Sequence, residues 1–142
     1  MVEDSKSGVK GASFSPKQPS SRAIRPEWVA RFKQDAEVHL AQISEGLQLL
    51  PPLLGQTITP EETESEQHDL RELFRHAHNL KGTARMIGLV EIAEAARLLE
   101  EALGQAYLEP LLFVSLQRKA VQEQVDSLMG LIQNIVTLPS SA

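Results

Sequence analysis

One histidine near the middle of the chain, His78, has neighbours whose types suit phosphoryl chemistry. Lys81 and Gly82 follow it, and Arg75 and Arg85 lie on either side in the sequence. A neutral imidazole is a good nucleophile near pH 7, because histidine has an unperturbed pKa of about 6.5. It can attack phosphorus and carry the phosphoryl group as a phosphoramidate, while cationic side chains stabilise the phosphoryl oxygens. This combination predicts a histidine that accepts phosphate.

The apolar residues around His78 repeat with the period of an α-helix, and this period predicts which side chains share a face. Successive residues are about 100° apart, so the apolar stripe centres about 130° from His78, which faces water. Gly82 lies about 40° from it. His76 lies about 160° away, so His76 and His78 cannot chelate one metal ion. Four cations fall within about 60° of His78: Arg71, Arg75, Lys81 and Arg85.

Each of these features also has a plainer explanation. A surface histidine usually has no function, a basic helix face is usually a solvated face, and Gly82 could serve close helix packing. A glycine inside a helix costs about 1 kcal/mol relative to alanine, so an exposed one needs a reason. Access of another protein to the imidazole is such a reason. It is the combination that favours a functional site.

Composition limits the class of protein. The 142 residues fit one domain plus a tail, and the net charge of −5 argues against nucleic-acid binding. The absence of cysteine excludes disulfides and thiolate metal sites. No apolar run reaches the length of about 20 residues that a membrane span needs. The N-terminus is polar and lacks the apolar region of a signal peptide. We therefore expect a cytoplasmic protein without membrane insertion.

Helix boundaries can be placed from prolines, caps and glycines. Residues 1–24 show no apolar period and predict a disordered tail. The first helix begins at Pro26 and ends before Pro51-Pro52. The second begins at a capping box, Thr59 to Glu62, or alternatively at Thr63, and ends at Gly88. The third follows directly. The segment Leu108-Glu109-Pro110 then leads into a fourth helix, which Pro139 ends.

The apolar stripes of these four helices predict the core and the fold. We expect an all-α, up-down-up-down four-helix bundle over residues 25–138, followed by a C-terminal tail or linker at 139–142. The stripes are Trp28, Phe32, Ala36, Leu40, Ile43, Leu47 and Leu50; Leu70, Leu73, Ala77, Leu80, Ala84 and Ile87; Ile92, Ala93, Ala96, Leu99, Leu103 and Ala106; and Leu111, Val114, Val121, Val125, Leu128, Ile132 and Ile135.

A family resemblance joins the motif to the fold. The string His78-Asn79-Leu80-Lys81-Gly82-Thr83-Ala84 resembles the signature of histidine phosphotransfer (HPt) domains. The longer stretch from Leu73 to Leu89 is most similar to the N-terminal phosphotransfer domain of CheA-like, chemotaxis-type histidine kinases. The first helix, from Phe32 to Leu47, is similar to the first helix of that family. The resemblance covers about residues 26–137.

The resemblance implies a function and a role for several residues. His78 would take a phosphoryl group from a histidine kinase domain and pass it to an aspartate of a response-regulator receiver domain. Lys81 and Gly82 match the family's neighbours of the histidine. Glu100 would bond the other ring nitrogen and leave Nε2 free to attack. Arg97 occupies the position where the chemotaxis family often has a second histidine.

Other chemistries lack their motifs. The sequence has no Walker loop, no glycine-rich nucleotide loop, no Gly-x-Ser-x-Gly elbow and no Glu-x-x-His pair. We therefore expect no enzyme activity of the chain alone, no metal and no bound cofactor, with Mg²⁺ and ATP on the partner domains. We also expect a monomer, either free-standing or a domain of a larger kinase. The alternative is a helical adaptor that binds a signalling partner without chemistry, in which His78 is incidental.

Overall fold

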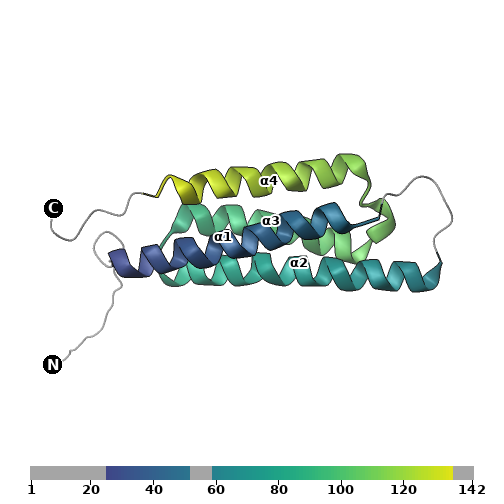
Figure 1. Cartoon of the computed structure of the whole chain (residues 1–142), viewed down its shortest axis with the longest axis horizontal. Coiled ribbons are helices and arrows are strands. Elements are labelled where there is room, and N and C mark those ends of the chain that lie inside the picture. The colour runs from purple at the N-terminus through teal and green to yellow at the C-terminus, as the bar shows by residue number, and fades with distance from the viewer. Residues whose placement is uncertain (1–24, 52–58, 136–142) are drawn as a thin grey trace, which may run out of the picture.

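The computed structural model describes residues 25–51 and 59–135, and these residues fold into helices (Figure 1). The expected tails, 1–24 and 139–142, lie outside the described residues. The helices are α1 (Pro26–Leu49), α2 (Pro60–Met86), α3 (Val90–Leu108), a short 3₁₀ helix η2 (Pro110–Leu112) and α4 (Ser115–Gln133).

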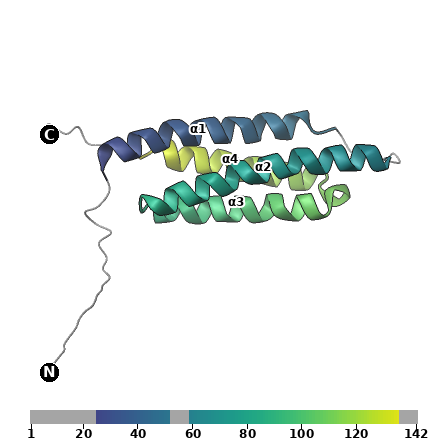
Figure 2. The same cartoon turned by 90° about the horizontal axis from the view of Figure 1, so that it is seen from below.

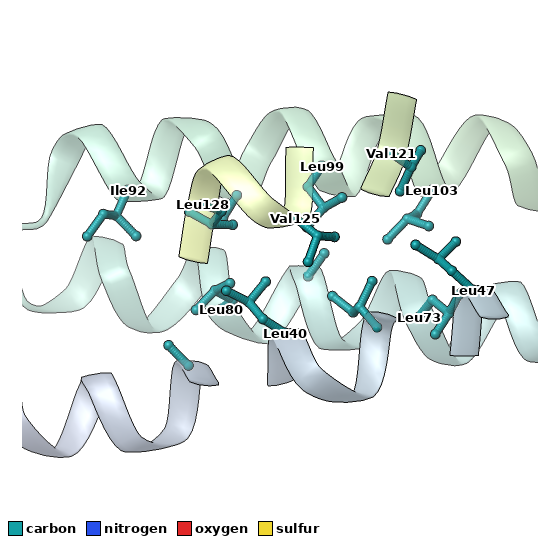
Figure 3. Close-up of a cluster of buried hydrophobic side chains, with 14 of the residues drawn as sticks. Leu40, Leu47, Leu73, Leu80, Ile92, Leu99, Leu103, Val121, Val125 and Leu128 are labelled. Carbon is teal, nitrogen blue, oxygen red and sulfur yellow. The ribbon is translucent and has the colours of Figure 1, made fainter. Parts of the chain in front are cut away.

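The four long helices run alternately up and down, as the sequence predicts. Helix α1 packs against α2 and α4, and α3 packs against the same two helices, so the four enclose one core (Figures 1 and 2). Leucines and valines from all four helices meet in this core, among them Leu40, Leu80, Leu99 and Leu128 (Figure 3). The predicted all-α bundle is confirmed.

Two of the predicted core stripes are wrong at their beginnings. Trp28 is 45% exposed, and its neighbour Val29 is buried in its place. At the other link, Leu111 is 54% exposed and Val114 is also exposed, whereas Phe113 is buried. The reason is that η2 turns more tightly than an α-helix and Val114 is extended, so the period of the fourth stripe does not continue back across the link.

The beginning of α2 decides between the two predicted helix starts, at Thr59 and at Thr63. The backbone N–H of Glu62 donates to Thr59 Oγ1 over 3.1 Å, and the N–H of Thr59 donates to Glu62 Oε1 over 2.9 Å. This reciprocal pair is the predicted capping box, so the helix begins after Thr59 and not at Thr63. At the other end of the fold, α4 finishes at Gln133, and Pro139 lies outside the described residues.

The turn from α2 into α3 determines how the two helices face each other. Gly88 has a φ of 85°, the left-handed conformation that glycine adopts without strain. The N–H of Leu89 donates to the carbonyl of Ala84, and the N–H of Gly88 donates to that of Arg85. Together, these two hydrogen bonds form a pattern that ends a helix sharply. It returns the chain antiparallel along α2 and places α3 beside His78.

A buried ion pair lies at the end of the bundle opposite residues 25 and 135. Arg118 on α4 donates to the Glu66 carboxylate over 2.9 Å, and its other nitrogens donate to the carbonyls of Phe113 and Pro51. Glu66 is only 2% exposed. Burial raises its pKa, and the adjacent guanidinium of Arg118 offsets part of that rise. One side chain therefore ties α2, α4 and both connecting segments together.

Candidate functional site

His78 lies in the middle of α2 and points into solvent. Its side chain is 58% exposed, as the helix period predicts. A Cβ built on Gly82, one turn further along, would meet no atom within 4 Å. Gly82 therefore does not serve helix packing. Gly46 on α1 does, because a Leu73 side chain of α2 occupies the space that its Cβ would need.

Glu100 reaches His78 from α3, where the sequence places it. His78 Nδ1 lies 2.5 Å from Glu100 Oε2, and Lys81 Nζ donates to Glu100 Oε1 over 2.6 Å. The Glu100 side chain is only 12% exposed, and Lys81 is almost as covered. Both oxygens of a nearly buried carboxylate are thus engaged by two residues of α2, one of them the exposed histidine.

The electrostatics of Glu100 decide the tautomer of the ring. Burial raises the pKa of Glu100, but the hydrogen bonds from Lys81 and His78 outweigh it, and the pKa is lowered overall. The carboxylate is therefore ionised at neutral pH and can only accept hydrogen bonds. It follows that Nδ1 of His78 carries the proton and donates a hydrogen bond to Glu100, while Nε2 keeps its lone pair free.

The expected cationic surround is looser than the helix period indicates. Arg75 is exposed and lies 3.8 Å from Glu72, and Arg71 lines a groove between α2 and α3 together with Arg75. Arg85 is exposed further along α2. Among the described residues, His78 hydrogen-bonds to Glu100 and to none of these arginines. They supply positive charge on the same helix without direct contact.

Two residues near the site have other partners. Arg97, at the position of the family's second histidine, forms an ion pair with Glu94 on its own helix, with 2.8 Å between Nη2 and Oε2. His76 is half-buried between α1 and α2, and its Nδ1 lies 3.0 Å from Nδ1 of His39. Burial and the neighbouring His39 lower the pKa of His76. Sequence reasoning missed this pair, because it depends on how α1 and α2 are aligned.

A further neighbour of His78 was not predicted. The ring of Phe74, one turn earlier on α2, lies nearly parallel to the imidazole, with 6.2 Å between centroids and 13° between planes. Its other edge lies against α3 at Gly104, where an added Cβ would be 3.4 Å from Phe74 Cε1. The spacing of four residues places Phe74 and His78 on one face of the helix, and this was the available signal.

No group of three or more acidic, histidine or cysteine side chains in residues 25–51 and 59–135 is arranged to hold a metal ion. Within the same ranges, no helix combines the length and the apolar character needed to cross a bilayer.

Fold and site together define a class of protein: a four-helix bundle with an exposed imidazole, hydrogen-bonded to a nearly buried carboxylate, on one helix face. The Hpt domain family matches residues 27–135, and the chain belongs to this family. The chain is thus a histidine phosphotransfer domain of two-component signalling, a class that works with kinases and receiver domains and has no kinase ATP site of its own. Neither the curated proteins nor the solved structures contain a match to this chain.

Proposed function

We propose that His78 is the residue that carries the phosphoryl group in this domain, and that Nε2 is the atom that bears it. One observation supports this assignment above the others. The Nδ1–H of an exposed imidazole donates a hydrogen bond to an ionised, nearly buried carboxylate, and Nε2 is left with its lone pair free. Gly82 leaves open space beside the ring for the active site of a partner protein.

The proposed transfer needs no proton to leave the ring. The Nε2 lone pair attacks the phosphorus of the donor, the N–P bond forms, and the bond from phosphorus to the leaving oxygen breaks. Because Nδ1 keeps its proton, the phosphorylated ring is cationic, and the negative charge of Glu100 balances it. When a receiver aspartate attacks the phosphorus, the N–P bond breaks and the ring returns to its neutral form.

Lys81 receives a different role from the one that its position on the helix predicts. Its ammonium lies on Glu100 and is largely covered, so we assign it to hold the carboxylate ionised and in place. Arg71, Arg75 and Arg85 are exposed and remain the candidates to attract the phosphoryl oxygens. The Mg²⁺ ion and the ATP that the relay uses are assigned to the partner domains.

We further propose a CheA-like context for the domain. The similarity of residues Leu73 to Leu89 and of the first helix to chemotaxis-type kinases supports a kinase catalytic domain of that type as the phosphate donor. A receiver domain of a response regulator is the proposed acceptor. A cytoplasmic location accompanies this proposal and is supported by membership of the Hpt family. A monomeric bundle is supported by the closed four-helix core.

The test of His78 is a phosphotransfer assay with a matched control. Wild type, His78→Gln and His76→Gln are each incubated with a CheA-type kinase core and ATP, or with a phosphorylated receiver domain. We expect acid-labile, alkali-stable label on wild type and His76→Gln and none on His78→Gln, because His76 faces His39 of α1 whereas the His78 side chain is 58% exposed.

The same assay decides against the adaptor alternative or for it. An adaptor would bind its signalling partner equally well after His78→Gln and would take no label in any form. Label on His78→Gln equal to that on wild type would instead assign the phosphoryl group to another residue and overturn the proposal. Trp28 fluorescence and circular dichroism show whether each variant is folded.

A further inference from the structure

The imidazole of His78 has two side-chain neighbours on its protein side. Glu100 bonds Nδ1, at one corner of the ring, and Phe74 lies parallel to the ring. The rest of the side chain is largely exposed, and a Cβ built on Gly82, one turn further along, would meet no atom within 4 Å. The contacts with Glu100 and Phe74 therefore orient the exposed imidazole.

The hydrogen bond to Glu100 leaves the plane of the ring only partly restrained. A hydrogen bond tolerates a range of angles, so the ring can still turn about its Cβ–Cγ bond over that range while the contact of Nδ1 with Glu100 persists. The attacking lone pair on Nε2 lies in the plane of the ring, so such a rotation changes the direction of attack. Reactions of this kind lose rate steeply when the nucleophile is misaligned. A second contact that defines the ring plane is therefore needed.

We propose that Phe74 is a positioning residue that fixes the plane of the His78 imidazole for transfer, an inference that rests on the proposed function of His78. The two planes differ by only 13°, and aromatic rings at this separation favour an offset parallel arrangement. Phe74 and His78 are four residues apart on one helix, so their relative position is independent of shifts between helices.

Phe74 is itself held in place by α3. Its edge lies against Gly104 of α3, and the ring packs on the core as a half-buried residue. An alanine at Gly104 would place a Cβ 3.4 Å from Phe74 Cε1, which is an ordinary contact distance. Gly104→Ala therefore alters the adjoining groove, which Gly104 and Phe74 both line, without moving the ring.

The experiment compares Phe74→Leu with two controls. Leucine retains the contact with the core but has no flat ring, Phe74→Tyr retains the ring, and Gly104→Ala changes only the groove. Transfer is measured from the phosphorylated receiver domain that exchanges fastest with wild type in a panel. We expect Phe74→Leu to lower kcat about tenfold with KM unchanged, and both controls to stay within about twofold of wild type.

A spectroscopic measurement on the unphosphorylated protein accompanies the kinetics. Nuclear Overhauser contacts between the Phe74 and His78 rings, and ring-current shifts of the imidazole protons, are expected in wild type and Phe74→Tyr. In Phe74→Leu the imidazole shifts move to motionally averaged values, while the ¹⁵N shift of Nδ1 stays that of a protonated nitrogen, because Glu100 still accepts from it.

Three results would overturn the inference. The first is an unchanged kcat in Phe74→Leu, and the second is an increase in KM alone, which would make Phe74 a docking residue. The third is the absence of ring contacts in wild type. Failure of the proposed function is distinguishable, because wild type would then take no label on His78 while the ring contacts were still measured.

Discussion

At the scale of single residues, Glu100 connects burial, charge and nucleophilicity. A carboxylate in this position would ordinarily be protonated more easily, since burial disfavours its charge, yet Lys81 and His78 hold it ionised. The proton on Nδ1 of His78 and the free lone pair on Nε2 both follow from that single charge. The chemistry of an exposed side chain is thus determined by a covered neighbour on another helix.

Replacement of Glu100 by glutamine tests this dependence. Glu100→Gln retains the shape of the side chain but loses the charge that balances a phosphorylated, cationic ring. We expect the rate of transfer to His78 to fall about tenfold or more, equivalent to about 1.4 kcal/mol of transition-state stabilisation. Stopped transfer assays measure the rate, and Glu101→Gln, the exposed neighbour on α3, is the control. A rate equal to wild type would show that the carboxylate charge is unimportant.

The same carboxylate predicts a dependence of stability on pH. The pKa of Glu100 is below its ordinary value of 4.5 in the folded protein, so its stabilising contribution is complete above about pH 4.5. That contribution disappears as the pH falls through the lowered pKa. Urea unfolding should therefore show wild type more stable than Glu100→Gln at neutral pH, with the difference shrinking on acidification. A difference that grows in acid would contradict the direction of the pKa shift.

At the scale of elements, the interface between α1 and α2 contains the His39–His76 pair. The two Nδ1 atoms lie 3.0 Å apart, so one ring donates a hydrogen bond to the other. The pKa of His76 is below 6.5, because of burial first and of His39 second, with Glu72 acting in the opposite direction and Arg75 in the same one. The interface therefore favours the neutral form of His76.

This pair predicts a loss of stability in mild acid. Stability from a histidine with a lowered pKa is present above pH 6.5 and is lost as the pH falls through the lowered value. We expect the free energy of unfolding of wild type to fall as the pH is lowered from about 6.5 to about 5, and to fall less in His39→Gln. His68→Gln, which changes an exposed histidine of α2, should behave as wild type does. An equal fall in His39→Gln would remove the pair as the cause.

Comparison of elements shows what the sequence can and cannot predict. The helix period locates most core positions and the exposure of His78, because both depend on rotation within one helix. The pairing of Glu100 with His78 was available only through the family resemblance. The contacts of His39 with His76 and of Glu66 with Arg118 depend on how neighbouring helices align, which no local pattern records. The predicted burial of Leu111 is wrong for a related reason. The tight turn of η2 interrupts the α-helical period, so the pattern of α4 does not extend back to Leu111.

At the scale of the whole molecule, Arg118 holds the closed end of the bundle. It bonds a buried carboxylate and the carbonyls of both connecting segments. Removing one member of a buried ion pair leaves the other charge uncompensated. At this end of the bundle, where the helices pass into the connecting segments, one guanidinium therefore holds helices and segments together.

Two variants test this closure. Arg118→Met should lower the free energy of unfolding by about 3 kcal/mol, and addition of Glu66→Leu should restore part of the loss, because no charge is then left buried. Urea denaturation of the single and double variants provides the measurement. A double variant less stable than Arg118→Met would show that Glu66 contributes by itself. His78 lies twelve residues along α2 from Glu66, about three helix turns away, so label uptake should persist in the variants that fold.

The sharp turn at Gly88 has a consequence for the order in which the molecule assembles. Because α3 returns directly along α2, the contacts of Glu100 with His78 and Lys81 span only 22 and 19 residues of chain. Contacts of short sequence separation form faster than those that close a long loop. The α2–α3 hairpin alone therefore contains the reactive ring, its carboxylate and its aromatic neighbour. The contacts that we propose for phosphoryl transfer can therefore form before α1 and α4 pack against the hairpin.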